Sequence, residues 1–312
     1  MIVVGGEALV DLVPSPSGES TVEGLPALLP RLGGGPYNVA VALGRLGSRV
    51  SFLSRVSTDF FGDALVGRLS ESKVDTSLLA RGAEPTTLAV VGLAEDGSAR
   101  YSFHVEGTAD RLVGDPGPLP AEVRAVSLGT LGMVLEPGAS AYEAVLRREA
   151  GLGRFTMLDP NIRSALITDP DAYRERFLSW LPHVGLLKLS VEDAAWLADA
   201  EDPWPAIREW VAKGPAGVVL TLGGEGLAVL TGRGGLVRVP AHRVEVVDTI
   251  GAGDTVHAAV LGWLDRNDAL SMESVRELPD ESWRSALEFA ARAAAITCSR
   301  AGAEPPWADE LN

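Results

Sequence analysis

The chain has 312 residues, 46% of them hydrophobic, which is enough for one large α/β domain or two smaller ones with a substantial core. Its 27 basic and 42 acidic residues give a net charge of −15, which argues against nucleic acid or an anionic membrane as a partner. An anionic ligand must therefore be held by a local arrangement of donors, and lysine is rare, with only Lys73, Lys188 and Lys213 present.

The amino-terminal residues MIVVGGEALVDLV have no basic leader and are interrupted by Glu7 and Asp11, which is typical of a strand and not of a signal peptide. No uncharged apolar run approaches the ~18–20 residues that span a bilayer. The single cysteine, Cys298, cannot form an intrachain disulfide and suits a reducing compartment. The sequence therefore predicts a cytoplasmic protein.

Short apolar runs alternate with helical patterns along most of the chain, which predicts an α/β fold with a mainly parallel central sheet covered by helices on both faces. We expect strands at residues 2–6, 49–56, 124–128, 155–159, 184–189 and 217–222. We expect helices at residues 36–46, 60–72, 139–150, 171–181, 191–199, 204–213, 254–266 and 281–299. No internal repeat or long linker divides the chain, so a single domain over residues 1–312 is favoured.

Two segments, about 11–31 and 86–106, interrupt this alternation. The second contains two β segments joined at Asp96-Gly97, which is a strong hairpin signal, and the first is extended chain broken by Pro14, Pro16 and Gly18. Together they predict a small antiparallel β lid attached to the main sheet, and such lids in α/β enzymes commonly close over ligands. An ordinary pair of edge hairpins is the alternative.

The first glycine cluster, LGGGPYNVAVALGRLG (32–47), leads into a predicted helix with Pro36 in its first turn. Gly34 and Gly35 let a ligand rest on the backbone, and Asn38 offers both a donor and an acceptor. This uncharged surface suits hydroxyl groups better than phosphates. A tight strand-to-helix turn without a ligand explains the same glycines equally well.

Three further motifs follow predicted strands, at the edge where open α/β sheets place their ligand sites. LDPNIR places Asn161 and Arg163 there, and LKLSVED places Lys188. In the second motif, Ser190-x-x-Asp193 is close to a capping box, and local reasoning favours that structural role. The third motif, TLGGEG (221–226), is equally compatible with a simple hairpin turn.

The stretch DTIGAGDTVH (248–257) places glycines in the first turn of a predicted helix, where they are costly unless something approaches the backbone closely. Backbone N–H groups at a helix N-terminus attract an anion without any lysine. Asp254 in the same turn is placed to accept a proton from a nucleophile aimed at that anion. Electrostatic stabilisation of the helix by Asp254 is the alternative.

Other nucleotide and metal motifs are missing from the sequence. No lysine follows a glycine as a P-loop requires, and the first βα turn lacks G-x-G-x-x-G. Zinc spacings are also missing, and the four histidines are scattered, so each is interpreted as structural.

Over essentially its full length, the ordered set of motifs resembles the ribokinase-like, or PfkB, family of carbohydrate kinases. The amino-terminal signature appears as GGGPYNVAVALGRLG and the carboxy-terminal signature as DTIGAGDTVHAAVL. GGGPYN, YSFHVEGTAD, DPNIR and KLS look most like bacterial fructokinases, whereas ribokinases typically have a lysine and a small residue in place of Pro36 and Tyr37. The resemblance implies ATP-dependent phosphorylation of a sugar's primary hydroxyl, with Mg²⁺.

The resemblance also implies roles for individual residues. The catalytic base would be Asp254, and the anion hole for the phosphoryl group would be Gly251, Ala252 and Gly253. Sugar hydroxyls would be held by Asp11, Gly34, Gly35, Asn38 and Asn161, with Arg163 near the sugar or the phosphates and Phe103 covering the ring. ATP would be met by Lys188, Ser190 and a nucleotide turn formed by Thr221, Gly223 and Gly226.

Two ion sites are implied in the same way. The family's N-x-x-E, which helps to organise Mg²⁺ through water, appears here as Ser190 to Asp193, so either Glu192 or Asp193 takes that role. A monovalent cation such as K⁺ would lie beside the anion hole, at Asp248, the carbonyl of Ile250 and the backbone near Gly302.

The leading hypothesis is a fructokinase whose partners are a sugar and ATP, with a homodimer paired through the lid strands as in related kinases. One alternative is another PfkB-type kinase that acts on 2-keto-3-deoxygluconate, ribose or a nucleoside. A second alternative, from a different class, is a catalytically silent sugar-binding protein on the same fold.

Overall fold

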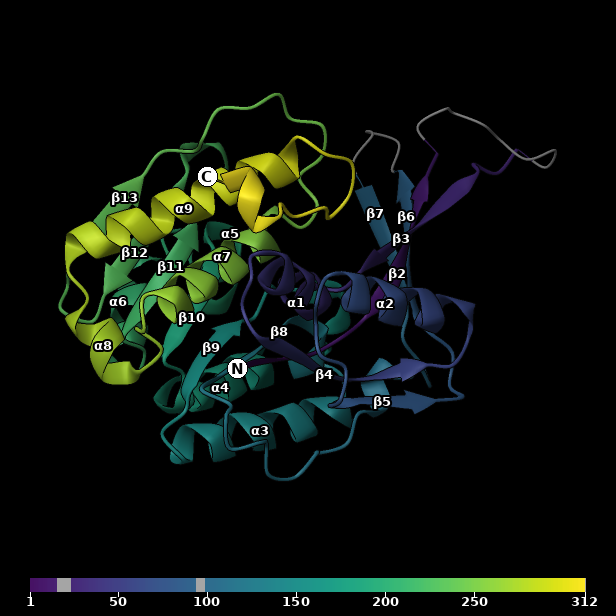
Figure 1. The fold of residues 1–312 in the computed structure, drawn as a ribbon, viewed down its shortest axis with the longest axis horizontal. Helices are drawn as coiled ribbons and strands as arrows, with labels where there is room; N and C mark the ends of the chain where they lie inside the picture. The colour runs from purple at the N-terminus through teal and green to yellow at the C-terminus, as the bar shows by residue number, and fades with distance from the viewer. Residues whose placement is uncertain (16–23, 94–98, 312) are drawn as a thin grey trace.

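The computed structural model describes residues 1–15, 24–93 and 99–311, and a nine-stranded sheet runs through its centre (Figure 1). The strand order is β13-β12-β11-β10-β9-β8-β1-β4-β5, in which the strands from β11 to β5 run parallel, β12 pairs antiparallel with β11, and β13 pairs antiparallel with β12. The strands are β1 (Ile2–Gly5), β4 (Val50–Ser57), β5 (Leu79–Gly82), β8 (Ala125–Gly129), β9 (Phe155–Asp159), β10 (Leu186–Ser190), β11 (Gly217–Thr221), β12 (Leu227–Thr231) and β13 (Leu236–Val239).

Helices cover both faces of this sheet, as the sequence predicts. One face packs against α1 (Gly35–Arg45), α2 (Phe60–Glu71), α7 (Ala252–Arg266), α8 (Met272–Glu277) and α9 (Asp280–Cys298). The other face packs against α3 (Gly138–Gly151), α4 (Pro170–Trp180), α5 (Val191–Ala198) and α6 (Trp204–Ala212). Successive strand residues alternate between the two hydrophobic cores, so that Val3 belongs to one and Val4 to the other.

The expected helices form with ends that differ by at most two residues, and the largest difference is at α7, which begins at Ala252 and not at residue 254. The sequence pattern did not indicate β5, β12, β13 or α8, which are all short. TLGGEG joins the antiparallel strands β11 and β12, so it is a hairpin turn. Among the described residues, no helix is both long and apolar enough to cross a membrane.

A second, four-stranded sheet stands beside the main one, in the order β3-β2-β6-β7. Its strands are β2 (Leu9–Pro14), β3 (Leu28–Gly33), β6 (Thr87–Leu93) and β7 (Ala99–His104). The expected all-antiparallel arrangement is wrong at its centre, where β2 and β6 pair in parallel. The reason is topological: β2 follows β1 and β6 follows β5, and these two strands point in the same direction in the main sheet.

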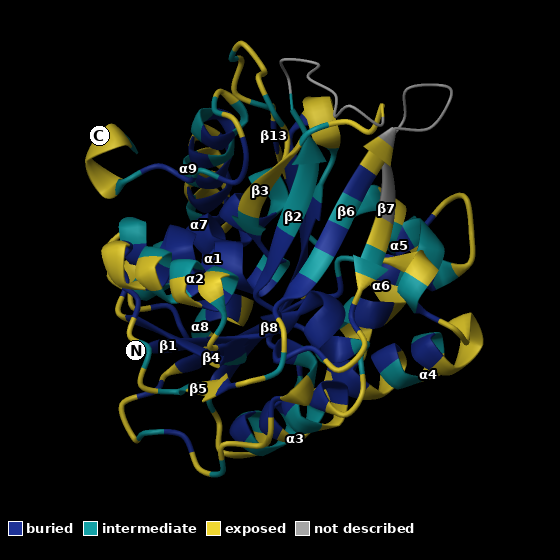
Figure 2. Cartoon of the chain, turned by 90° about the vertical axis from the view of Figure 1, so that its right-hand side faces the viewer, coloured by how far each residue is buried: buried dark blue, intermediate teal, exposed yellow. Residues whose placement is uncertain are grey.

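The edge of the small sheet is exposed. Figure 2 shows β3 largely exposed and its neighbour β2 less so, in agreement with four exposed residues in β3. Four residues on which the lid prediction drew, Pro16, Gly18, Asp96 and Gly97, lie outside the described residues.

Candidate active site

A cavity of about 520 Å³ lies where the small sheet meets the carboxyl ends of the parallel strands. Residues that follow β1, β8 and β9 line it, together with Lys188 in β10 and the turns before α1 and α7. The cavity brings together most of the site residues expected from the sequence, namely Asp11, Gly34, Gly35, Asn38, Phe103, Asn161, Arg163, Lys188, Ile250, Gly251, Gly253 and Asp254.

Asp254 occupies the third position of α7 and is buried at the cavity wall. One of its carboxylate oxygens accepts a hydrogen bond of 2.9 Å from Asn38 Nδ2. Burial raises the pKa of Asp254 to about 6, although the hydrogen bond from Asn38 and the charge of Lys188 oppose this shift. The carboxylate is therefore ionised at neutral pH and close enough to its pKa to accept a proton.

The N-terminus of α7 presents backbone donors to the same cavity. Gly251 precedes the helix with φ at 76°, and a Cβ there would lie 2.5 Å from the Cβ of Ala303. The first helical hydrogen bond runs from Thr255 N to Gly251 O at 2.9 Å, so the N–H groups of Gly253 and Asp254 precede it and have no helical acceptor. This end of α7 is suited to an anion.

Lys188 adds a positive charge at this point. A Cβ on Gly253 would lie 3.1 Å from Lys188 Nζ, so the missing side chain lets the ammonium group reach the helix N-terminus. Lys188 is buried and pairs with the buried Asp159 at 2.8 Å. Burial lowers the pKa of Lys188, but the attraction of Asp159 outweighs it and the net shift is upward. The ammonium group therefore stays charged.

The opposite side of the cavity carries polar groups suited to hydroxyls. Arg163 Nη1 donates to Asn161 Oδ1 at 2.8 Å, and Asn161 adopts a left-handed φ of 39°. Burial raises the pKa of Asp11 to about 6, against the charge of Arg163. Phe103 on β7 packs with Leu9, Ala89 and Leu131, so its ring forms an apolar part of the wall.

Glu7 and Thr130, which the sequence analysis did not select, are polar residues that also line the cavity. Glu7 is buried, and its two carboxylate oxygens accept hydrogen bonds from Gly35 N at 3.0 Å and Gly132 N at 3.1 Å. Burial raises the pKa of Glu7 to about 8. Both residues follow parallel strands, so the rule that selected Asn161 and Lys188 would have selected them as well.

His257 lies one turn beyond Asp254 and is buried behind the cavity. Its Nε2 is 2.7 Å from Ser127 Oγ. Burial and the charge of Lys188 lower the pKa of His257 to about 3, so the ring is neutral. Its place fits the structural role expected for the histidines.

The remaining expected residues lie outside this cavity. Ala252 is the first residue of α7 and donates its N–H to Thr249 O at 3.2 Å. Thr221 pairs in register with Ser190 at the carboxyl ends of β11 and β10, and Gly223 and Gly226 lie in the following turn with left-handed φ angles of 56° and 107°.

The residues expected at the two ion sites are arranged differently from each other. Ser190 and Asp193 form the capping box of α5, and Asp193 also accepts a hydrogen bond from Ile162 N at 2.8 Å, whereas Glu192 is exposed. Asp248 accepts hydrogen bonds from Ile250 N at 3.0 Å and Gly302 N at 2.8 Å, which brings those three residues together. Within the described part of the chain, no three metal-binding side chains cluster.

The chain has a ribokinase-like α/β fold, and its site combines a helix N-terminus suited to an anion, a buried carboxylate beside it and further polar side chains, which are groups that suit a small-molecule kinase. The sequence matches the pfkB family of carbohydrate kinases over residues 1–310, and the chain belongs to that family.

Individual relatives agree with this assignment. The chain is 36% identical over 286 residues to a fructokinase of Rhizobium leguminosarum bv. trifolii, covering 91% of this chain and 86% of the relative. The crystal structure of fructokinase with bound ATP from Xylella fastidiosa has a TM-score of 0.89 at 28% identity, covering 99% of this chain and 96% of that one. An aminoimidazole riboside kinase from Salmonella enterica, complexed with aminoimidazole riboside and an ATP analog, has a TM-score of 0.83 at 25% identity, covering 100% and 98%.

Proposed function

We propose that this chain transfers the γ-phosphoryl group of ATP to the primary hydroxyl of D-fructose, producing fructose 6-phosphate and ADP. The observation that carries the proposal is the buried Asp254 carboxylate at the N-terminus of α7, oriented by Asn38 inside a 520 Å³ cavity. The fructokinases among the relatives in sequence and structure support the choice of sugar.

Asp254 is the base in this proposal. With a pKa of about 6 it is ionised at pH 7 and accepts the proton of the attacking hydroxyl. A positioned general base typically contributes ~10²–10⁴ in rate. Because the transition state of phosphoryl transfer is loose, the proton leaves the hydroxyl late and a strong base is not required.

Charge on the transferring phosphoryl group is neutralised by preorganised donors. The backbone of Gly251, Ala252 and Gly253 forms the anion hole, in which the N–H of Gly253 has no helical acceptor and that of Ala252 is held by Thr249 O. Lys188 adds a fixed cation beside it, and Asp159 maintains the charge of Lys188. These groups need no reorganisation during the reaction, which is why such donors lower the barrier. The net charge of −15 is compatible with ATP binding because the local potential is positive.

The sugar lies between the small sheet and the main sheet, in a single kinase domain whose small sheet acts as a lid. Hydroxyl groups bind to the backbone at Gly34 and Gly35 and to the side chains of Asp11, Asn38, Asn161 and Arg163, and Phe103 covers the ring. ATP continues from the cavity along the carboxyl ends of β10 and β11, where it meets Lys188, Ser190, Thr221, Gly223 and Gly226.

The carboxylates of Glu192 and Asp193 near the nucleotide fit a hydrated Mg²⁺, which would neutralise charge on the ATP phosphates. Both carboxylate oxygens of Asp193 accept backbone N–H groups, whereas Glu192 is exposed, so Glu192 is the better choice for holding the ion through water. We assign a K⁺ site to Asp248, Ile250 and Gly302, because the hydrogen bonds of Asp248 hold these backbone segments together.

Strand β3 lies at the exposed edge of the small sheet, where a strand of another subunit can pair with it. This supports a cytoplasmic homodimer in which the small sheets of the two subunits pair.

A sugar-acid or riboside kinase is the alternative enzyme. Arg163 is exposed at the cavity, where its guanidinium would meet a substrate carboxylate, and one structural relative is complexed with a riboside. A catalytically silent sugar binder is disfavoured because binding alone requires no base beside the phosphate site.

A sugar panel separates these possibilities. With ATP and Mg²⁺, we expect the highest kcat/KM for D-fructose among fructose, ribose, 2-keto-3-deoxygluconate and aminoimidazole riboside, measured by coupled detection of ADP. Faster turnover of another sugar would overturn the choice of fructose but keep the kinase. Calorimetric sugar binding without ATP binding or ADP release would favour the silent binder.

A further inference from the structure

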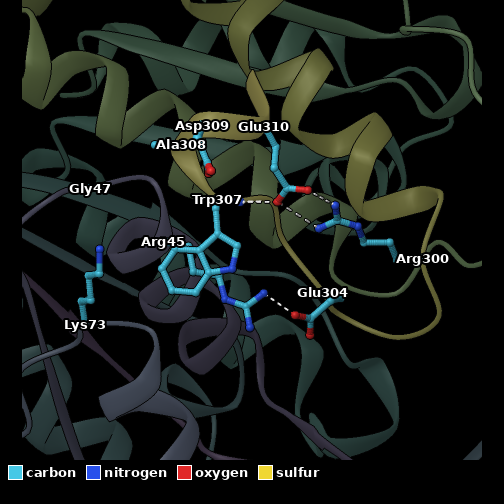
Figure 3. A pocket seen from close by; sticks show the side chains of 9 residues that line it. All are labelled: Arg45, Gly47, Lys73, Arg300, Glu304, Trp307, Ala308, Asp309 and Glu310. Atoms are coloured by element: carbon cyan, nitrogen blue, oxygen red, sulfur yellow. Dashed lines mark hydrogen bonds and ion pairs between the residues drawn. The ribbon is translucent and has the colours of Figure 1, made fainter. Parts of the chain in front are cut away.

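A second cavity, of about 780 Å³, lies beside the carboxyl-terminal segment (Figure 3). In Figure 3, the Arg45 guanidinium lies by the Trp307 ring and reaches Glu304, while Arg300 pairs with Glu310. The segment that forms this wall carries three ion pairs, one to α1, one to α2 and one within the carboxyl-terminal region itself.

Glu304 joins this segment to two helices. Its carboxylate pairs with Arg45 in the last turn of α1 and, at 2.9 Å, with Arg68 of α2. The same two guanidinium groups also donate to the carbonyl oxygens of Pro305, at 2.9 Å, and Ala303. The arginine side chains are only 9% and 17% exposed, whereas that of Glu304 is 42% exposed, so solvent screens these pairs in part.

Residues 302–305, which Arg45 and Arg68 hold, support the turn that precedes α7. Ala303 packs so closely that a Cβ on Gly251 would lie 2.9 Å from its Cα. The preceding residue, Gly302, donates to Asp248 at 2.8 Å, and Asp248 accepts from Ile250 N at 3.0 Å. The backbone of the proposed anion hole therefore rests on residues 302–304.

The ion pairs of Glu304 with Arg45 and Arg68 also fix α1, which carries the other half of the site. The first turns of α1 carry Asn38, which bonds Asp254, and the last turn of α1 carries Arg45, which bonds Glu304. Glu304 thus connects α1, which carries the turn proposed to bind hydroxyls, with the N-terminus of α7. Its own side chain does not line the 520 Å³ cavity.

Building on the proposed kinase activity, we infer that Glu304 is a positioning residue for phosphoryl transfer, acting through Ala303 on the Gly251 turn. Without its carboxylate, Arg45 and Arg68 lose their shared partner, and residues 302–305 are held to α1 and α2 only by the two carbonyl hydrogen bonds of Ala303 and Pro305. The N–H groups at Gly251 to Gly253 then move relative to Asp254. Small misplacements of reacting groups, of about 1 Å, can cost ~10²-fold in rate.

The kinetic test compares Glu304→Ala, Glu304→Gln and the control Glu310→Gln. The control weakens an ion pair of the same segment, but Glu310 pairs with Arg300 and accepts from Trp307 N, and it interacts with Arg45 only through a weak charge effect. At a temperature well below each variant's Tm, we expect kcat to fall about 10-fold in Glu304→Ala with KM for fructose within about twofold. Glu304→Gln keeps one acceptor oxygen, enough for one of the two guanidinium groups, and should lose less than Glu304→Ala, and Glu310→Gln should resemble wild type.

Amide hydrogen exchange provides a readout that does not require turnover. The amides of residues 250–254 should exchange faster in Glu304→Ala than in wild type, and should be unchanged in Glu310→Gln. A Glu304→Ala variant with wild-type kcat and wild-type exchange, whether or not its Tm falls, overturns the inference. If wild type phosphorylates none of the sugars, the proposed function fails, while the exchange data still decide whether Glu304 orders the turn.

Discussion

Asn38 and Asp254, which are 216 positions apart, share a hydrogen bond of 2.9 Å between Nδ2 and Oδ2. This contact joins the first turn of α1 to the first turn of α7, so it links the glycine turn assigned to the sugar with the helix N-terminus assigned to phosphate. The two signature motifs of the chain therefore form one site, and the orientation of the base depends on both.

Replacing Asp254 with asparagine tests the base directly. Asparagine has nearly the same shape, so we expect the fold and ATP binding to be retained, as measured by Tm and calorimetry. It cannot accept the proton, so kcat should fall by ~10²–10⁴. A near-normal kcat would show that another group takes the proton.

The pH dependence of the reaction follows from the raised pKa of Asp254. The base must be ionised, so kcat/KM should fall as the pH drops through about 6. Because the hydrogen bond from Asn38 lowers this pKa, Asn38→Ala should move the acid limb to higher pH. The pKa of Asp11 is also raised to about 6, so Asp11→Asn is the control, and the limb must persist in it. An acid limb that disappears with Asp11 would contradict the assignment.

Much of the fold was predictable because the periodic pattern of a doubly covered parallel sheet is strong. Helices such as α7 and α9 show the helical apolar period over many residues, and each βα unit repeats the alternation of an apolar strand with a helical pattern. The short elements β5 and α8 were not recognised because four to six residues carry too little periodicity. The parallel pairing of β2 with β6 depends on how both strands leave the main sheet, which no local pattern encodes.

The site was predictable where a motif or a strand end was distinctive. Asp254 and Asn161 were found because glycine turns and Asn/Arg strand ends are unusual in a core. Glu7 was interpreted only as a break in an apolar strand, because its bonds to Gly35 and Gly132 connect segments far apart in sequence. The pairing of Lys188 with Asp159 was missed for the same reason.

That buried pair gives a prediction about stability. Lys188→Met leaves the buried Asp159 carboxylate without its cation, which should cost about 3–5 kcal/mol in the free energy of unfolding. Adding Asp159→Asn removes the stranded charge and should restore most of that loss, but not the activity, because the phosphate site still lacks its cation. Lys213→Met at an exposed position is the matched control and should change little in urea unfolding. Equal destabilisation in the single and double variants would contradict this account.

Glu7 should make stability depend on pH in a specific direction. Burial raises its pKa from an ordinary 4.5 to about 8, so between these values the folded chain keeps a proton that the unfolded chain releases. Its contribution to stability is therefore complete below about pH 4.5 and is lost as the pH rises through 8. Glu7→Gln cannot titrate, so the Tm of wild type minus that of the variant should decrease steadily from pH 5 to pH 8. Scanning calorimetry across this range measures the difference, and a difference independent of pH would show that Glu7 is ionised in the folded protein throughout.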